Sequence, residues 1–268
     1  MVDFQSILIK HRFKCKKALG QNFIYDGELL DEIAQAGGAD GKCVVEIGAG
    51  SGSLSYAIAK RARSLCAFEI DETLFPVLDE TLGEFDNVRL FSNNVLELGH
   101  ETVDVLIGEP YIVIANLPYY ITTPLIFLFL KSALCGSVTC LVQKEVAERI
   151  CARSGGDFGA LSCAVQSVAE PTKIRDIKAW EFDPMPEVDS ALIRLDRIPG
   201  AALTDESETF VKQCFAQKRK TLVNNLVGAG IDKQRVTEAL LSLGFNAAAR
   251  AEQLGAENIF KLNKLLNG

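Results

Sequence analysis

Three glycines followed by an acid could hold a nucleoside ligand. Gly48, Gly50 and Gly52 come directly after the apolar run 44–47 and before a helical pattern. Glycine accepts positive φ and lets a ligand approach the backbone closely, and the first amides of a helix favour negative groups. Glu69 ends the next strand-like run, about 20 residues further on, where a carboxylate can accept hydrogen bonds from both ribose hydroxyls. Each feature alone also fits a tight turn or a solvated strand end, but their order favours a ribose-binding site.

The spacing of the glycines favours one class of ligand. A pyrophosphate-binding loop has a third glycine in the pattern G-x-G-x-x-G, and that position is Ser53 here. A ligand with a ribose but no pyrophosphate therefore fits better. The leading candidate is S-adenosylmethionine.

A further strand-like run leads into Asn116-Leu117-Pro118-Tyr119. This segment resembles the [N/D]-P-P-[Y/F] motif of methyltransferases that act on exocyclic amines of bases, and its N-L-P-Y form is similar to the ribosomal RNA adenine dimethyltransferase family. Such an amine is a poor nucleophile because its lone pair is delocalised into the ring. The Asn116 side-chain oxygen and the Leu117 carbonyl could accept its hydrogens, and Tyr119 offers a face for stacking. Catalysis would then consist mainly of positioning the amine against the methyl group.

Other segments resemble the same family, and the resemblance implies their roles. Residues 19–24 are similar to an L-G-Q-N-F-L segment, which implies that Asn22 and Ile24 contact the cofactor, as Asn116 does; without the family, Asn22 would be read as a turn former. Asn94 stands where the family has an aspartate that accepts from the cofactor's adenine amine. The amide oxygen can still accept, but the charge is absent, which puts cofactor affinity in question.

Two later segments imply contacts with the RNA substrate. Residues 143–149 resemble the family's Q-K-E-V-A-x-R segment, with Lys144 and Arg149 as candidates for phosphate contact. Residues 182–190 resemble F-x-P-x-P-x-V-D-S, in which Phe182 would stack on the second face of an extruded adenine. The alternative is that Phe182 belongs to the hydrophobic core.

Charge is unevenly distributed along the chain. The net charge of −7 excludes a uniformly basic nucleic-acid binder but permits local basic surfaces. Two basic clusters could contact RNA phosphates, although each could also be a solvated charge run. They are Lys10, Arg12, Lys14, Lys16 and Lys17 near the N-terminus, and Lys218, Arg219 and Lys220 in the C-terminal part.

Composition indicates a globular protein of the reducing cytoplasm. Of 268 residues, 48% are hydrophobic and 24% charged, and no apolar run approaches the length of a membrane span. The eight cysteines form no C-x-x-C pair, so we interpret them as reduced, buried side chains. With two histidines and no ligand spacing, we expect no metal site. We also expect no secretion signal and a monomer.

The pattern of strands and helices that must position these residues indicates an α/β protein. Six strand-like runs lie at 44–47, 64–68, 88–91, 112–115, 138–142 and 191–195, mostly separated by helical patterns. We predict a Rossmann-like, seven-strand methyltransferase domain over residues 1–199, whose last strand is antiparallel. A small helical, RNA-binding domain follows over residues 200–268, after Pro199-Gly200.

The family resemblance implies a specific reaction. It is dimethylation of two adjacent adenines near the 3′ end of small-subunit (16S) rRNA, within a pre-30S particle during ribosome biogenesis. Two alternatives remain open. One is a large-subunit rRNA adenine methyltransferase of the antibiotic-resistance type, and the other is a ribosome-assembly factor whose main role is binding.

Overall fold

A computed structural model describes residues 2–267 of the chain. The chain folds into two compact units. The first runs to Ala147 and resumes over Thr172–Arg197, and the second comprises Glu148–Pro171 and the described residues from Ile198 onward. The helical second unit therefore includes a segment that precedes the expected boundary at residue 199.

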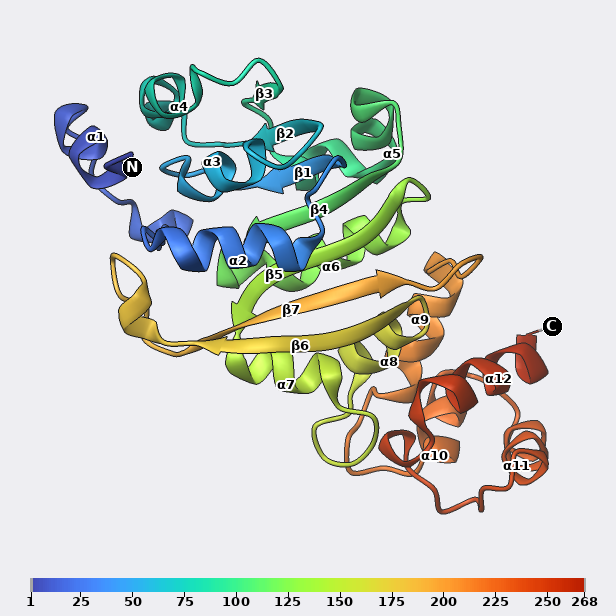
Figure 1. The fold of residues 1–268 in the computed structure, drawn as a ribbon. Helices are drawn as coiled ribbons and strands as arrows, with labels where there is room; N and C mark the ends of the chain where they lie inside the picture. The colour runs from blue at the N-terminus through green and yellow to red at the C-terminus, as the bar shows by residue number, and fades with distance from the viewer. Residues whose placement is uncertain (1, 268) are drawn as a thin grey trace. The chain divides into compact units, whose positions relative to one another are not determined.

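The sheet is seven-stranded, with the order β3-β2-β1-β4-β5-β7-β6 (Figure 1). Neighbours from β3 to β5 pair in parallel, and β7 pairs antiparallel with β5. The predicted fold class is confirmed. The strands are β1 (Cys43–Ile47), β2 (Ser64–Phe68), β3 (Val88–Phe91), β4 (Tyr111–Asn116), β5 (Cys135–Gln143), β6 (Ala169–Ile177) and β7 (Ser190–Arg197).

Helices cover both faces of this sheet (Figure 1). In the first unit, α2 packs on α3, α3 on α4, and α5 on α6. The helices up to the end of β5 are α1 (Phe4–Lys10), α2 (Gly27–Gly37), α3 (Ser53–Ala59), α4 (Phe75–Leu82), α5 (Val95–Ile107) and α6 (Thr122–Lys131). Short 3₁₀ turns lie at η1 (Lys17–Leu19), η2 (Glu72–Leu74), η3 (Tyr119–Ile121) and η4 (Ala179–Glu181).

The second unit is helical apart from the start of β6. Its helices pack in the pairs α8 with α9, α10 with α11, and α11 with α12. The sequence places Phe210, Phe215, Leu222 and Leu226 in an apolar stripe expected in the core; three of them are buried, and Phe215 is half-buried. The helices are α8 (Ala160–Gln166), α9 (Asp205–Cys214), α10 (Leu222–Gly228), α11 (Lys233–Ser242) and α12 (Gly255–Asn267), with η5 (Ala251–Gln253); α7 (Lys144–Cys151) begins in the first unit and ends here.

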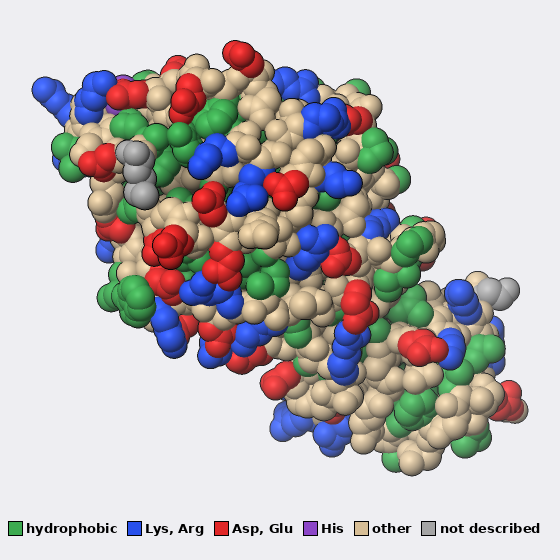
Figure 2. Space-filling model, viewed as in Figure 1, with side chains coloured by type: hydrophobic (Ala, Val, Ile, Leu, Met, Phe, Trp, Pro, Cys, Tyr) green, Lys and Arg blue, Asp and Glu red, His purple; other side chains and the backbone are tan. Residues whose placement is uncertain are grey.

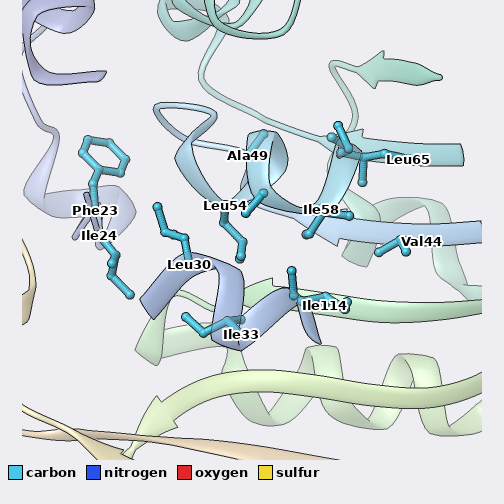
Figure 3. Close-up of a cluster of buried hydrophobic side chains, with 14 of the residues drawn as sticks. Phe23, Ile24, Leu30, Ile33, Val44, Ala49, Leu54, Ile58, Leu65 and Ile114 are labelled. Carbon is cyan, nitrogen blue, oxygen red and sulfur yellow. The ribbon is translucent and has the colours of Figure 1, made fainter. Parts of the chain in front are cut away.

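The core beside the cleft lies between α2, α3 and the sheet. Figure 3 shows Leu30 of α2 pointing toward Leu54 of α3, and Ile33 of α2 and Ile114 of β4 belong to the same buried cluster. All five residues of β1 are buried because helices cover both faces of the parallel part of the sheet. This packing holds the carboxyl ends of β1 and β4 in fixed positions.

Two elements were not apparent from the sequence. The N-terminal basic cluster is preceded by the helix α1, which ends at Lys10 and buries Phe4 and Leu8 at helical spacing. Strand β6 is the last in the strand order, and four of its nine residues are charged side chains that are exposed or half-buried. An edge strand needs neither continuous burial nor regular alternation, so the hydrophobic pattern of β6 is weak.

The cysteines are free. Six are buried as predicted, whereas Cys15 is exposed and Cys151 is half-buried, so the prediction of burial is wrong for these two. No helix within residues 2–267 is long and apolar enough to cross a membrane.

Candidate active site

A cleft of about 710 Å³, partly open to solvent, lies at the carboxyl ends of β1, β2 and β4. This is where ligands bind in open parallel sheets. Six of the predicted site residues meet there, from segments far apart in the sequence: Asn22, Gly48, Gly50, Glu69, Asn94 and Asn116. Leu19, Gly20, Gln21, Asn93 and Tyr120 also line it. Of these, Gln21, Asn93 and Tyr120 are immediate neighbours of predicted residues, which is the signal that could have identified them.

The glycine loop presents bare backbone to the cleft. Gly48 has φ 77°, and no atom lies within 4 Å of the point where a Cβ would be. Gly50 has φ 59°, and a Cβ there would lie 2.7 Å from the Phe23 ring. A side chain at Gly50 would therefore displace Phe23 as well as strain the backbone. The loop is held to β2, because the amides of Gly48 and Ala49 both donate to the Phe68 carbonyl.

Glu69 lies at the end of β2 with both carboxylate oxygens oriented by backbone amides. Oε2 accepts from the Gly50 amide at 2.8 Å, and Oε1 accepts from the Asp71 amide at 2.8 Å. Burial raises the pKa of Glu69, and these two hydrogen bonds partly offset that rise. Each oxygen retains a lone pair, so the carboxylate can accept from two further hydroxyls.

Asn116 lies at the end of β4 with its amide group in one orientation. Its Nδ2 donates to the backbone carbonyl of Asn22 at 2.8 Å. A carbonyl can only accept, so the amide nitrogen must face Asn22. The Oδ1 atom is thereby left as an acceptor, which is the chemistry expected for holding an amine hydrogen.

The two tyrosines after Asn116 differ in their surroundings. The Tyr119 hydroxyl shares a 2.6 Å hydrogen bond with the Ser190 hydroxyl, and burial raises its pKa. Tyr119 is half-buried and does not line the cleft, whereas Tyr120 lines it and is 58% exposed. The Leu117 side chain is buried. Stacking by Tyr119 and acceptance by the Leu117 carbonyl remain predictions.

Phe182 and Ile24 belong to the hydrophobic core beside the cleft. Phe182 is 4% exposed and follows η4. The next residue, Asp183, exchanges two backbone hydrogen bonds with Phe23, at 2.8 and 3.0 Å. This bridge holds the loop against the cleft wall with the Phe182 ring turned inward. Stacking of Phe182 on a base would therefore require the ring to leave the core. Ile24 is buried and lines a smaller cavity, which Asn116 also borders.

Asn94 serves as the N-cap of α5. Its Oδ1 accepts from the Leu96 amide at 3.1 Å, and its Nδ2 donates to Glu97 at 2.8 Å. Capping uses one lone pair of the oxygen and leaves the other available. The side chain can therefore still accept a hydrogen bond at the cleft, which it lines.

Glu46 is a titratable group that the sequence did not single out. It lies in β1, is 1% exposed and borders the smaller cavity together with Asn116 and Gly48. Its Oε2 has no hydrogen-bond partner among the described residues. Burial raises the pKa of Glu46 to about 8, although Ser55 opposes this rise. In the sequence, Glu46 is the one acidic residue within the apolar run 44–47, and this position could have indicated a buried carboxyl group.

The predicted RNA-binding lysines of the first unit are partly engaged in ion pairs. Lys16 contacts Asp71 at 2.6 Å, and Lys144 contacts Asp176 at 2.8 Å. Lys14 and Lys17 are exposed. On the face seen in Figure 2, Lys and Arg side chains are interspersed with Asp and Glu.

In the second unit, Lys218, Arg219 and Lys220 form an exposed loop with Gln217 that borders a hollow. The Lys218 ammonium donates to the Gly156 carbonyl at 2.9 Å. Arg149 is also exposed. Binding of RNA by these side chains remains a prediction.

Comparison with known proteins identifies the family. The family described as ribosomal RNA adenine dimethylase matches residues 12–268. The chain belongs to this family. Ribosomal RNA small subunit methyltransferase A of Alkaliphilus oremlandii is 40% identical over 264 residues, which cover 94% of this chain and 92% of the relative. The protein of the same name in Bacillus mycoides is 39% identical over 278 residues, with 98% and 94% covered. The resemblance drawn from the motifs is confirmed.

Solved structures agree on the fold. A dimethyladenosine transferase from Plasmodium falciparum superposes with a TM-score of 0.77 at 23% identity, covering 91% of this chain and 98% of that one. The 23S rRNA methyltransferase ErmE superposes with a TM-score of 0.72 at 25% identity, covering 92% and 100%. The fold is thus found in a dimethyladenosine transferase and in a 23S rRNA methyltransferase.

Proposed function

We propose that this chain transfers methyl groups from S-adenosylmethionine to the exocyclic amines of two adjacent adenines near the 3′ end of small-subunit rRNA, giving dimethyladenosine. The observation that carries this proposal is Asn116, whose amide nitrogen is held by Asn22 so that its oxygen remains an acceptor beside the Glu69 cleft. Identities of 39–40% to proteins named for the small subunit support that substrate over large-subunit rRNA.

The cleft suits this cofactor. The Glu69 carboxylate is fixed by two backbone amides and has lone pairs for two vicinal hydroxyls. Gly48 offers open backbone where the remainder of the ligand would lie. Asn22 and Ile24 would lie toward its amino-acid end, and Asn94 toward its adenine. When bound, S-adenosylmethionine supplies an electrophilic methyl group on a sulfonium sulfur.

In this proposal, Asn116 Oδ1 and the Leu117 carbonyl accept the two hydrogens of the target amine. This draws the lone pair out of the ring and directs it at the methyl carbon. S-adenosylmethionine would supply the methyl carbon and would keep the electron pair of the broken C–S bond on its sulfur. The methylated amine becomes acidic and loses its proton to water, so no strong base is required. Tyr119 would stack on one face of the extruded base, whose unstacking costs a few kcal/mol. Phe182 would stack on the other face once its ring, 4% exposed in this structure, has left the core.

We propose that the basic side chains and the helical domain of residues 200–268 hold the RNA. The exposed 218–220 loop and Lys14, Lys17 and Arg149 provide cations for phosphate contact. The physiological partner would be a pre-30S particle in the cytoplasm, bound by a monomer during ribosome biogenesis.

The test is methylation of undermethylated 30S subunits, followed by mass analysis of rRNA digests. We expect dimethyladenosine in two adjacent positions of the small-subunit rRNA and none in large-subunit rRNA offered separately. Asn116→Ala should lower turnover on the order of 10²-fold or more at saturating cofactor, as when one preorganised polar group is removed from an active site. Glu80→Gln, on the exposed face of α4, is the matched control.

If only the large-subunit rRNA is methylated, the chain is instead a large-subunit rRNA methyltransferase of the antibiotic-resistance type. Tight binding to 30S particles without turnover would favour the assembly-factor alternative. Near-normal dimethylation by Asn116→Ala would contradict the role given to Asn116.

A further inference from the structure

A buried carboxylate connects the segment before α2 to the end of β2. Asp71 is 3% exposed. Its Oδ1 accepts from the Lys16 ammonium at 2.6 Å, and its Oδ2 accepts from the Gln21 side-chain amide at 2.9 Å. These contacts join residues about 50 positions apart in the sequence. Thr73 adds a backbone and a hydroxyl hydrogen bond to Oδ1, so both oxygens of the carboxylate have partners.

Segment 16–22 is also closed on itself. The Lys16 backbone amide donates to Gln21 Oε1 at 2.7 Å. Within it, the 3₁₀ turn η1 ends at Leu19 and is capped by Gly20, which has φ 62°. The segment is therefore a closed loop. Its Lys16 and Gln21 side chains both donate to Asp71, and Lys16 also donates to the Thr73 hydroxyl at 3.2 Å.

Segment 16–22 forms one wall of the cleft and contacts residues of the site. Leu19, Gly20, Gln21 and Asn22 line the cleft. The Asn22 carbonyl orients Asn116, and the following residue, Phe23, packs against Gly50. Asp71 also contacts the site directly, because its backbone amide donates to the Glu69 carboxylate.

We propose that Asp71 is a positioning residue, which clasps segment 16–22 onto the cofactor cleft through Lys16 and Gln21 and thereby holds Asn22 against Asn116. The proposal rests on the proposed function for the identity of the ligand. Lys16 is consequently a structural cation of the cleft rather than a free RNA-binding side chain. An RNA phosphate that binds Lys16 would compete with Asp71.

The lowered pKa of Asp71 agrees with this geometry. Burial alone raises the pKa of Asp71, but hydrogen bonds from Lys16, Thr73 and Gln21 outweigh it and lower the pKa to about 2. The carboxylate is therefore ionised throughout the range in which the protein would work. Removal of its charge is the specific perturbation that should open the clasp.

The test uses the full-length protein and two variants. Asp71→Asn keeps the shape of the side chain, but its new amide group would face the Gln21 amide, donor against donor. Lys16→Met removes the ammonium alone. Hydrogen–deuterium exchange of residues 16–22 should accelerate at least tenfold in Asp71→Asn, while exchange in β4 and the melting temperature change little. The dissociation constant of S-adenosylhomocysteine should rise about tenfold.

The control is Glu80→Gln, which breaks the contacts of Glu80 with Lys10 and His11 between the N-terminal region and α4. It should change neither exchange in 16–22 nor ligand affinity. Because Lys16 acts on the clasp through its contact with Asp71, the double variant Lys16→Met/Asp71→Asn should bind no more weakly than Asp71→Asn.

Unchanged exchange in 16–22, or unchanged affinity in Asp71→Asn, would overturn the proposal while leaving the proposed function intact. Faster exchange spread over the whole sheet would also overturn it, because that result indicates general destabilisation. If the wild-type protein neither binds S-adenosylhomocysteine nor methylates RNA, the proposed function fails, and the exchange measurement alone decides whether the clasp exists.

Discussion

The buried Glu46 should make the ligand-free protein less stable as pH rises toward 8. The Glu46 carboxyl is 1% exposed, and its Oε2 lacks a hydrogen-bond partner within residues 2–267. Burial raises its pKa from the ordinary 4.5 to about 8. The folded state therefore binds this proton more tightly than the unfolded state. The resulting stabilisation is complete below pH 4.5 and is lost as pH rises through 8.

The magnitude follows from the change in proton affinity. A tenfold change corresponds to about 1.4 kcal/mol, so a pKa rise from 4.5 to about 8 corresponds to at most roughly 5 kcal/mol. Glu46→Gln retains the shape and cannot ionise. The stability of the wild type relative to this variant should therefore fall by about 2–5 kcal/mol between pH 5 and pH 8.

Urea unfolding at pH 5, 6, 7 and 8 measures this difference for both proteins. Glu101→Gln, which replaces an exposed glutamate of α5, is the control and should follow the wild type at every pH. A constant difference between wild type and Glu46→Gln from pH 5 to pH 8 would refute the reasoning. It would mean that Glu46 is ionised and satisfied in the folded protein.

Three further predictions concern ligand binding. Glu69→Ala should weaken cofactor binding by on the order of 1.5–3 kcal/mol, the scale of hydrogen bonds to a charged group, and unchanged affinity by calorimetry would exclude Glu69 from the site. Neutralising Lys218, Arg219 and Lys220 should weaken RNA binding and flatten its salt dependence in proportion to the number of phosphates that these side chains neutralise; an unaltered salt slope would make this loop a solvated surface. Phe182→Ala should lower the free energy of unfolding by about 3–5 kcal/mol, because the ring is buried. Phe182→Leu preserves most of that stability, so loss of binding to a fluorescent base analogue in Phe182→Leu would identify stacking, whereas retained binding would assign Phe182 to the core.

The sequence by itself determined the order of elements and the family. Strand, glycine turn and helix follow one another around Gly48 within about 15 residues, and hydrophobic periodicity reports such local units reliably. The position of Glu69 at the end of β2 follows from the same pattern. The parallel sheet then places these strand ends at one edge, so the meeting of Gly48, Glu69 and Asn116 was predictable.

Only the tertiary structure decided how these groups are oriented. Asn116 donates to a carbonyl 94 residues away, and Asp71 holds Gln21 across 50 residues. No local pattern encodes such partners, because they depend on how separate elements pack. The same is true of Phe182, whose motif permits both stacking and burial, and of Glu46. The raised pKa of Glu46 results from desolvation. This desolvation arises only when the elements around Glu46 have packed together.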